Sequence, residues 1–353
     1  MDSPDSFRTF TVLSGGVGGA RFLQGLLRLL GPAAHADRDG QTRGREGAVA
    51  PGAPAVTVVA NTGDDLWLHG LKVCPDLDTV MYTLGGGIDE DRGWGRAGES
   101  WHAMEELTAY GVEPTWFGLG DRDLGTHLVR TQMLDAGYPL SAVTAALCER
   151  WQPGVRLLPM TDERVETHIV VDDDREPSGR RAIHFQEYWV RLHAEVPARA
   201  VVAVGIEGAK PAPGVLEALV GADLVLLPPS NPVVSLGTVL GVPGVREAVR
   251  TSPAPVVGLS PVVAGSHVRG MAAQLLTALG VEVSAAAVAE HYGGRDRGGV
   301  LDGWLVDEAD ADQVDRVRDA GIACRAVPLM MTDPEATAAM AQAALELAAE
   351  VRT

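Results

Sequence analysis

Short aliphatic runs alternate along the chain with longer amphipathic stretches. The short runs show no regular change between apolar and polar residues, which is typical of strands buried on both faces of a parallel sheet. They lie at Thr9 to Leu13, Val56 to Asn61, Ala200 to Val204, Leu224 to Leu227 and Val256 to Leu259, and the helical stretches lie at Arg21 to Leu30, Gly214 to Val220, Val245 to Thr251, Gly270 to Leu279 and Glu335 to Val351. The alternation predicts a doubly wound, mostly parallel, Rossmann-like α/β sheet.

Three segments depart from this alternation. Pro32 to Pro54 is rich in Ala, Gly, Arg and Asp, and we expect a surface loop there that takes no part in the chemistry. Thr79 to Tyr138 is mostly helical in pattern and predicts a cap over the sheet. Glu166 to Asp172 and Arg181 to Trp189 flank a polar tip and predict a β-hairpin. We therefore expect a single α/β domain over residues 1–353, with a surface loop at 32–54 and the cap and hairpin inserted at about 79–190.

The composition narrows the class of protein. The formal net charge of −18, from 29 Lys and Arg against 47 Asp and Glu, argues against binding to nucleic acid or to an anionic membrane surface. The three cysteines lie far apart, which indicates neither a zinc cluster nor a disulfide framework. No apolar run reaches the roughly 18 residues of a membrane span, and none of signal length follows the first residues. We expect a soluble, cytoplasmic protein.

A glycine-rich junction joins the first predicted strand to the first predicted helix. Gly15, Gly16, Gly18 and Gly19 free the backbone to adopt positive φ and to approach a ligand, while amides at the start of the helix point at an incoming anion. The spacing excludes the P-loop, because no Gly-Lys-Ser/Thr follows, and the dinucleotide fingerprint Gly-x-Gly-x-x-Gly. The junction predicts a phosphate cradle; the alternative is a tight turn that packs the helix on the sheet.

Four carboxylates follow the second predicted strand. Asp64 and Asp65 come three and four residues after Asn61, and Asp76 and Asp78 follow in Cys-Pro-Asp-Leu-Asp-Thr. Because ligands of open α/β sheets bind outside the carboxyl ends of the strands, we expect these carboxylates beside the glycine junction. Mg²⁺ commonly bridges one or two carboxylates to substrate phosphates, and the arrangement predicts this cation. Asp65 and Asp78 are the favoured ligands, whereas Asp64 and Asp76 suit a helix N-cap or a turn equally well.

Three further loops carry polar groups. In the segment Gly118 to Asp123, Arg122 either binds a phosphate or pairs with a neighbouring aspartate. Ser230 and Asn231 follow two prolines and offer neutral hydrogen bonds to a base, a ribose or a phosphate. Ser260 to Gly265 is a second candidate anion pocket or a plain turn.

The motifs taken together resemble one family. Ser-Gly-Gly-x-Gly-Gly, Asn-x-x-Asp-Asp-Leu-Trp, Cys-Pro-Asp-Leu-Asp-Thr, Leu-Gly-Asp-Arg-Asp, His-Phe-Gln-x-x-Trp and Pro-Ser-Asn-Pro occur here in the order seen in the 2-phospho-L-lactate transferase family of coenzyme F420 biosynthesis. The resemblance runs from about Thr9 to Glu350. The segments Met81 to Gly87 and Ala289 to Tyr292 look like the bacterial branch, which is understood to use a phosphoenolpyruvyl-derived donor.

The resemblance implies a reaction and a set of roles. A guanosine diphosphate-type donor carrying phosphoenolpyruvate or 2-phospho-L-lactate transfers its phospho-acid group to the terminal hydroxyl of the deazaflavin Fo, and GMP leaves without a covalent enzyme intermediate. Arg122 and the cap from Trp94 to Trp116 are assigned to the deazaflavin or to the donor's carboxylate, and which aspartate accepts the hydroxyl proton stays open. The implied residues are Asp65 and Asp78 as Mg²⁺ ligands, Asp64, Asp65, Asp78 and Arg122 in catalysis, and Gly15, Gly16, Gly18, Gly19, Asn61, Asp76, Asp121, Ser230, Asn231, Ser260 and Gly265 in substrate binding.

The alternative function is that of a different class of protein, a regulator that binds its ligand without turnover. The same fold family is understood to include a bacterial regulator of cell-envelope metabolism that binds a nucleotide-sugar without turnover, and that group reads Asp-Asp-Gly-Gly-Ser-Ser-Gly after its second strand. This chain instead reads Asp64-Asp65-Leu66-Trp67. A nicotinamide-dependent oxidoreductase is excluded by the glycine spacing. We expect small-molecule substrates and a homodimer, with neither nucleic acid nor a membrane as partner.

Overall fold

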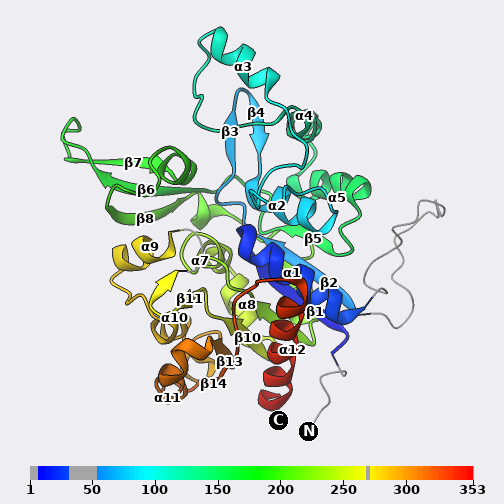
Figure 1. Ribbon diagram of the computed structural model, residues 1–353, viewed down its shortest axis with the longest axis vertical. Coiled ribbons are helices and arrows are strands. Elements are labelled where there is room, and N and C mark those ends of the chain that lie inside the picture. Colours follow the sequence, from blue (N-terminus) through cyan, green and yellow to red (C-terminus); the bar gives the residue numbers. More distant parts are fainter. Residues whose placement is uncertain (1–6, 32–53, 268–270, 353) are drawn as a thin grey trace, which may run out of the picture.

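The computed structural model describes residues 7–31, 54–267 and 271–352. Within these ranges the centre of the protein is a seven-stranded sheet in the order β14-β13-β10-β9-β1-β2-β5, in which every neighbouring pair is parallel (Figure 1). The strands are β1 (Thr9–Ser14), β2 (Ala55–Ala60), β5 (Arg156–Pro159), β9 (Leu224–Leu227), β10 (Val256–Leu259), β13 (Gly303–Val306) and β14 (Ala323–Ala326). The predicted doubly wound α/β sheet is confirmed.

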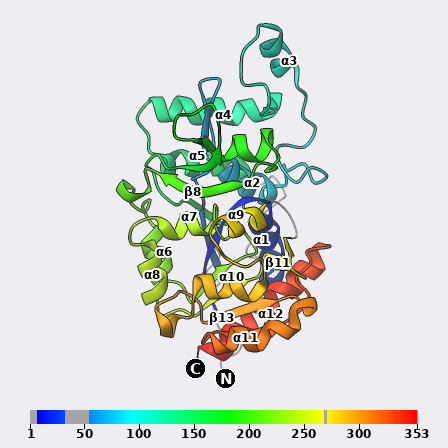
Figure 2. The ribbon, with the colours of Figure 1, turned by 90° about the vertical axis from the view of Figure 1, so that its left-hand side faces the viewer.

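Helices cover both faces of this sheet, and each face has its own hydrophobic core. Val12 of β1 and Val58 of β2 lie in one core, while the next residues, Leu13 and Val59, lie in the other. Successive side chains of a strand point to opposite faces, so a strand buried on both faces must be apolar throughout. Figure 2 shows α6 and α8 on one side of the sheet and α1 and α12 on the other. The helices packed around the sheet are α1 (Gly16–Leu30), α2 (Pro75–Leu84), α5 (Leu140–Trp151), α6 (Val215–Val220), α7 (Leu236–Gly241), α8 (Val245–Thr251), α9 (Ala272–Ala278), α10 (Ala285–Tyr292), α11 (Val314–Asp319) and α12 (Pro334–Val351).

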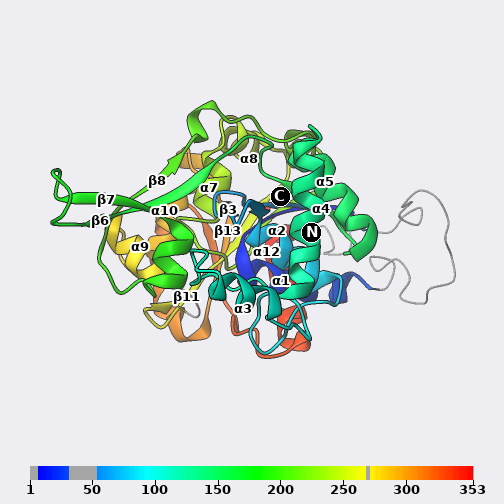
Figure 3. The ribbon, with the colours of Figure 1, turned by 90° about the horizontal axis from the view of Figure 1, so that it is seen from above.

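The segments between β2 and β9 build two further bodies beside the sheet. One consists of the antiparallel hairpin β3 (Leu66–Leu68) and β4 (Leu71–Val73) with the helices α3 (His102–Ala109) and α4 (Asp121–Asp135). The other is a small antiparallel sheet of β7 (Arg180–His184), β6 (Glu166–Asp172) and β8 (Ala198–Val204). Figure 3 shows the small sheet on one side of the molecule and α4 and α5 on the other.

Several predicted elements are corrected by the structure. The run from Ala200 to Val204 belongs to β8 of the small sheet, because its partner is β6, and part of it is exposed. The second strand of the predicted hairpin ends at His184 and a π-helix covers Glu187–Arg191. The expected insertion at 79–190 is divided by β5, which is an edge strand of the central sheet. The surface loop predicted for residues 32–54 lies outside the described residues except at Pro54.

The topological switch of the sheet lies at β1. β1 pairs with β2 on one side and with β9 on the other, and the chain order reverses between them. The register sets Ser14 beside Ala60 at the ends of β1 and β2, so the loops that follow these strands emerge together. Ligands of open α/β sheets bind at this position, outside the carboxyl ends of the strands.

The described residues also bear on membrane insertion. None of the helices in the described ranges combines the length and the apolar composition that crossing a bilayer requires.

The contact between α1 and α12 generates a stability prediction. A Cβ on Gly25 of α1 would lie 2.5 Å from Cγ2 and 2.6 Å from the carbonyl carbon of Thr337 in α12, so Gly25→Ala must separate the helices. We expect this substitution to lower the unfolding free energy by about 1–3 kcal/mol, the usual effect of overpacking. In Gly125→Ala of α4 a Cβ meets nothing within 4 Å, and we expect a gain of about 1 kcal/mol from helix propensity. Urea unfolding measures both; a stabilised Gly25→Ala protein would contradict the packing described here.

Candidate active site

The loops after β1 and β9 are joined by one serine at the switch point. The Ser230 hydroxyl donates to the Gly15 carbonyl at 2.8 Å, and the Gly15 amide donates to the Ser230 Oγ at 3.3 Å. Asn231 fixes the same loop, because its Oδ1 accepts from the amides of Val233 at 2.9 Å and Val234 at 3.2 Å. The hydrogen bonds of Ser230 Oγ and Asn231 Oδ1 therefore hold this loop in place.

The four glycines of the junction do two different things. Gly15 is the extended N-cap residue of α1, and Gly16 opens the helix with a φ of 62°, which a residue with a Cβ rarely adopts. Gly18 and Gly19 lie inside α1, where a Cβ would approach the Pro229 carbonyl oxygen to 2.5 Å or the Ser14 Oγ to 2.2 Å. For Gly18 and Gly19 the structure supports the packing alternative, and the open helix N-terminus is confined to Gly15 and Gly16. A helix start of this kind, with no acidic residue in its first turn, suits an anion.

Asn61 links the end of β2 to the start of α2. Its Nδ2 donates to Asp76 Oδ2 at 2.9 Å, and its Oδ1 accepts from the Gly63 amide at 2.9 Å. Cys74 is the N-cap residue of α2, with no side-chain capping bond, and Pro75 follows at the first helical position. Asp76 is therefore not the N-cap of α2, and its carboxylate faces Asn61 and the glycine junction, with Oδ1 about as close to Gly16 as a van der Waals contact.

Asp64 and Asp65 are buried without sufficient partners. Asp65 is 1% exposed and Asp64 4%, yet neither oxygen of Asp65 nor Oδ1 of Asp64 has a hydrogen-bond partner, and the buried Thr62 hydroxyl has none either. Buried polar groups are normally satisfied, and an unpaired buried carboxylate is costly. Asp65 Oδ2 is in an ion pair with Lys72 Nζ at 3.3 Å, and the other oxygens are open to a ligand of positive charge.

The oxygens at this edge fit Mg²⁺. In the described part of the chain, no three His, Cys, Asp or Glu side chains converge into a ready metal cage. Mg²⁺ seldom uses such a cage, because it keeps waters and binds through one or two carboxylates together with substrate phosphates. Asp65, with Asp64 beside it, offers the hard oxygen donors for that arrangement.

The carboxyl pKa values at this edge are raised. Burial raises the pKa of Asp64 well above its usual value, and the neighbouring Asp76 carboxylate adds to the shift. Burial raises the pKa of Asp76 to about 6, against the lowering effect of the Asn61 amide. Burial also raises the pKa of Asp65, although Lys72 opposes the shift. The surroundings at the end of β2 therefore disfavour the ionised forms of these carboxyl groups as long as no cation is bound.

Asp78 has a different environment from Asp65. Arg130 of α4 is 2% exposed and holds both oxygens of Asp78, with its Nη1 3.0 Å from Oδ2 and its Nη2 bonded to Oδ1. The network continues through His127, whose Nδ1 lies 3.1 Å from Arg130 Nη1, and on to Asp123, which accepts the Tyr82 hydroxyl at 2.6 Å. Asp78 is thus the fixed end of a buried chain of polar groups that runs into α4.

Asp121 and Arg122 lie at the start of α4, and the structure ties both to the segment before α3. Asp121 accepts hydrogen bonds from the Ser100 hydroxyl and from the amides of His102 and Ala103. These bonds hold the start of α3 and lower the pKa of the Asp121 carboxyl group. The exposed Arg122 donates to the Ala97 carbonyl at 3.2 Å. Among the described residues, neither forms a hydrogen bond or ion pair with Asp64, Asp65 or Asp76.

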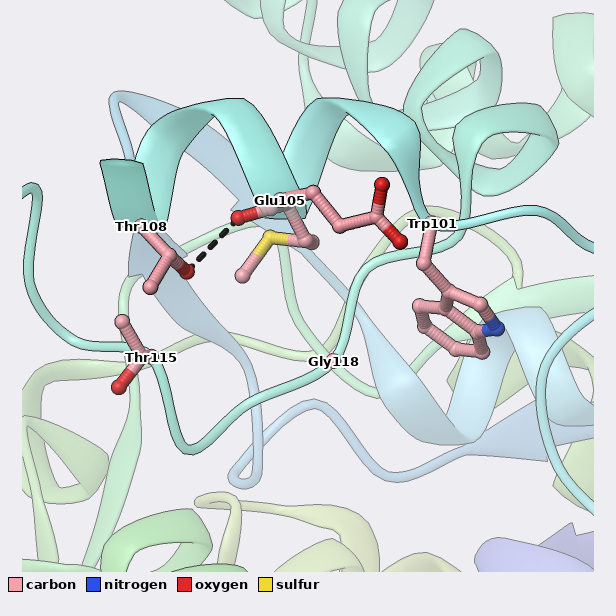
Figure 4. Close-up of a pocket in the computed structure, with 6 residues that line it drawn as sticks. Trp101, Glu105, Thr108, Thr115 and Gly118 are labelled. Carbon is pink, nitrogen blue, oxygen red and sulfur yellow. Dashed lines mark hydrogen bonds between the residues drawn. The ribbon is translucent and has the colours of Figure 1, made fainter. Parts of the chain in front are cut away.

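A pocket of about 460 Å³ lies on the outer part of the same body, beside α3. Figure 4 shows Trp101, Glu105 and Thr108 on one side and Thr115 and Gly118 on the segment that passes below the helix. α3 lies at the end of the molecule beyond β3 and β4 in Figure 1. This pocket is therefore separate from the carboxylates at the end of β2.

Comparison with known proteins adds the family to this geometry. The sequence pattern that defines the 2-phospho-L-lactate transferase CofD family matches residues 10–343 of the chain. The chain belongs to this family. A phosphoenolpyruvate transferase of Streptomyces coelicolor is 64% identical over 341 residues, covering 97% of this chain and 98% of the relative. The protein of the same name from Mycolicibacterium smegmatis is 58% identical over 338 residues, covering 96% of this chain and 98% of the relative.

The fold is also found in a solved structure. Protein BH3568 from Bacillus halodurans superimposes with a TM-score of 0.59 at 16% sequence identity, covering 97% of this chain and all of that one. At this identity the likeness concerns the fold. The family resemblance predicted from the motifs is confirmed, and with it the broad class of a transferase family.

For this CofD-family chain the structure brings together part of the predicted site. The residues gathered at the switch point are Gly15, Gly16, Asn61, Asp64, Asp65, Asp76, Ser230 and Asn231. Ser260 closes its own turn, since its hydroxyl donates to the Val262 carbonyl and accepts from the Val262 amide. Gly265 lies in the short hairpin β11 (Val262–Val263) and β12 (Ser266–His267), with a φ of 70°. Their part in substrate binding stays a prediction.

Sequence reasoning missed three side chains that the structure places at this edge. Lys72 Nζ lies 3.3 Å from Asp65 Oδ2, His184 Nε2 lies 3.2 Å from the Asp65 carbonyl oxygen, and Arg130 holds Asp78. A signal existed for Lys72, because it is one of two lysines in the chain and stands between two acidic motifs. His184 stands in the His-Phe-Gln motif, which pointed only to the family.

The raised carboxyl pKa values generate a prediction on stability. A carboxyl group whose pKa is raised by folding favours the folded state when protonated, so this contribution is present at low pH and is lost as pH rises through the folded pKa. For Asp76, with a folded pKa of about 6, we expect the metal-free protein to lose about 1 kcal/mol between pH 5 and pH 7. Urea unfolding at both pH values in a chelator measures the loss. Asp76→Asn, which removes the titrating group, should reduce it, and equal stability at both pH values would contradict the assignment.

Proposed function

We propose that the protein transfers a phosphoenolpyruvyl group from a guanosine diphosphate-type donor to the terminal hydroxyl of the deazaflavin Fo, with release of GMP, in coenzyme F420 biosynthesis. The observation that carries the proposal is the pair of buried carboxylates Asp64 and Asp65, three of whose four oxygens have no hydrogen-bond partner, beside the N-terminus of α1 at the switch point. The printed names of the relatives, phosphoenolpyruvate transferases at 54–65% identity, support the enolpyruvyl donor. A 2-phospho-L-lactyl donor is the alternative within the family.

Phosphoryl transfer requires alignment and neutralisation of negative charge. In this proposal Asp65, with Asp64 beside it, would hold Mg²⁺, which when bound supplies positive charge to the diphosphate. The N-terminus of α1 receives a phosphate group, and the loop of Ser230 and Asn231 lies next to it. We assign guanosine and Fo to the loops next to this site and to no individual residue.

Bond making and breaking balance without a covalent enzyme intermediate. The Fo hydroxyl oxygen forms a bond to the phosphorus of the phospho-acid, the bond from that phosphorus to the bridging oxygen breaks, and GMP carries the electrons away. A carboxylate must accept the hydroxyl proton. Asp76, with a pKa of about 6, is suited to a proton acceptor near neutral pH, and Asp64 is the other candidate.

Asp78 takes a different role in this proposal from the one that the sequence predicted. Both of its oxygens are hydrogen-bonded to the buried Arg130, whereas neither oxygen of Asp65 has a hydrogen bond and only Oδ2 is in an ion pair, with Lys72. We therefore assign Asp78 to positioning α2 and Asp65 to the metal. The homodimer and the place of Arg122 near the deazaflavin remain predictions.

A donor comparison tests the proposed function. The protein is incubated with Fo and Mg²⁺ and with either the enolpyruvyl or the lactyl guanosyl diphosphate, and products are identified by mass spectrometry. We expect GMP and the enolpyruvyl product, which is two hydrogens lighter than the lactyl one. Turnover of the lactyl donor alone would show that the donor carries a 2-phospho-L-lactyl group and not an enolpyruvyl group. Binding of nucleotide without a product from either donor would instead favour the regulatory alternative.

The metal assignment is tested by one substitution. Asp65→Asn keeps the size of the side chain and removes its charge, so we expect activity to fall by about 100-fold or more, since charge stabilisation in the transition state is usually the largest catalytic contribution. Far-ultraviolet circular dichroism shows that the fold is kept. Asp312→Asn, at an exposed position of the short helix Glu308–Gln313, is the matched control. A near-full rate in Asp65→Asn would remove this residue from the metal site.

A further inference from the structure

Lys72 is a buried cation that the family assignment leaves without a role. It lies on β4 opposite Trp67 of β3, and 10% of its side chain is exposed. The Lys72 amide donates to Thr131 Oγ1 at 2.9 Å, and its carbonyl accepts from Arg130 Nη1 at 3.3 Å. Two side chains of α4 thus fix the backbone from which the ammonium reaches Asp65.

The Lys72 ammonium occupies a position beside Asp65 that a divalent cation would also need. Its Nζ is 3.3 Å from Asp65 Oδ2, and neither Asp65 oxygen has a hydrogen-bond partner among the described residues. The ion pair with the Asp65 carboxylate favours the charged form of Lys72. A positive charge so close to Asp65 opposes a second cation on the same carboxylate.

The buried Lys72 ammonium also affects the free energy of cation binding at Asp65. If Asp65 gives its oxygens to a divalent cation, Lys72 is left buried without its partner, which is strongly unfavourable. A diphosphate arriving with the cation removes this difficulty, because its oxygens accept the ammonium. Cation and diphosphate then favour each other's binding.

We propose that Lys72 is the internal counter-ion of Asp65 in the free protein and binds a phosphate oxygen of the donor once a divalent cation takes its place. This inference rests on the proposed function, and it adds that metal and donor bind together. Lysine suits the role, because a compact charge on a flexible stem can move between two anions, whereas the fork of an arginine is held to one. Two of the 29 basic residues are lysines, and one of them is placed here.

One variant separates this role from a purely structural one. Lys72→Met removes the charge and keeps the length of the side chain. We expect Mn²⁺ alone, measured by electron paramagnetic resonance, to bind about tenfold more tightly, and GDP in the presence of Mg²⁺, measured by calorimetry, to bind about tenfold more weakly, on the scale of charge effects at this separation. The exposed Lys210, whose backbone contacts Glu163 and Thr161, provides the control Lys210→Met, which should leave both affinities unchanged.

The opposite signs of the two effects make the test decisive. A variant damaged in its fold would bind both ligands more weakly, and that outcome overturns the counter-ion role, as does unchanged Mn²⁺ affinity. If the native protein binds Mn²⁺ and GDP and the variant behaves like it, this inference fails and the proposed function stands. If the native protein binds neither Mn²⁺ nor GDP, both fail.

A measurement on the unsubstituted protein gives independent support. Lysine labelled with ¹⁵N in the side chain gives signals from two ammonium groups, since the chain has two lysines. We expect the Lys72 signal to shift when Mg²⁺ and GDP are added together, and not with the same concentration of Mg²⁺ alone, while the Lys210 signal stays in place. A Lys72 signal that does not respond to Mg²⁺ with GDP, or responds equally to Mg²⁺ alone, overturns the proposal.

Discussion

Buried negative charge at the ends of β1 and β2 is the constraint on which the rest of the site depends. Four aspartates are buried there, and Lys72 and Arg130 are the buried lysine and arginine of the described residues. Moving such charges out of water is costly unless each is paired. Arg130 satisfies Asp78 fully and Lys72 satisfies Asp65 in part, while the pKa values of Asp64 and Asp76 are raised by burial. The free protein therefore carries a deficit of positive charge at its switch point.

The cap helix α4 contributes to the site although it lies outside the central sheet. Arg130 of α4 contacts both Asp78 and the Lys72 carbonyl, so one guanidinium positions the start of α2 and the end of the β3–β4 hairpin. His127 extends the contact to Asp123, which also accepts the Tyr82 hydroxyl at the other end of α2. A displacement of α4 would alter the surroundings of Asp65 through Lys72. The cap is in this way part of the machinery that holds the charges.

Particular elements show how far sequence patterns can be trusted here. β9 and β10 were predicted with their observed bounds, because strands buried on both faces must be aliphatic throughout. The equally aliphatic run in β8 was assigned to the wrong sheet, since Val202 and Val204 are partly exposed and composition does not identify the strand's partner. β5, β13 and β14 were missed because Arg, Pro, Trp or Cys interrupts the aliphatic pattern in each of them. The glycine junction was predicted as a cradle of four residues, and two of them pack α1 against the loop after β9.

The sequence by itself determined the α/β class, the strand ends that carry polar residues and, through its motifs, the family. Those features are local: an aliphatic run, a glycine pair or an acidic pair is written in consecutive residues. The tertiary structure decided which carboxylate is paired and which is open. Arg130 and Asp78 are 52 residues apart, and His184 and Asp65 are 119 apart, so their meeting depends on how the cap and the small sheet fold back on the switch point. Arg130 engages both oxygens of Asp78, whereas Lys72 reaches one oxygen of Asp65, so the same side chain in two electrostatic surroundings has two different chemistries.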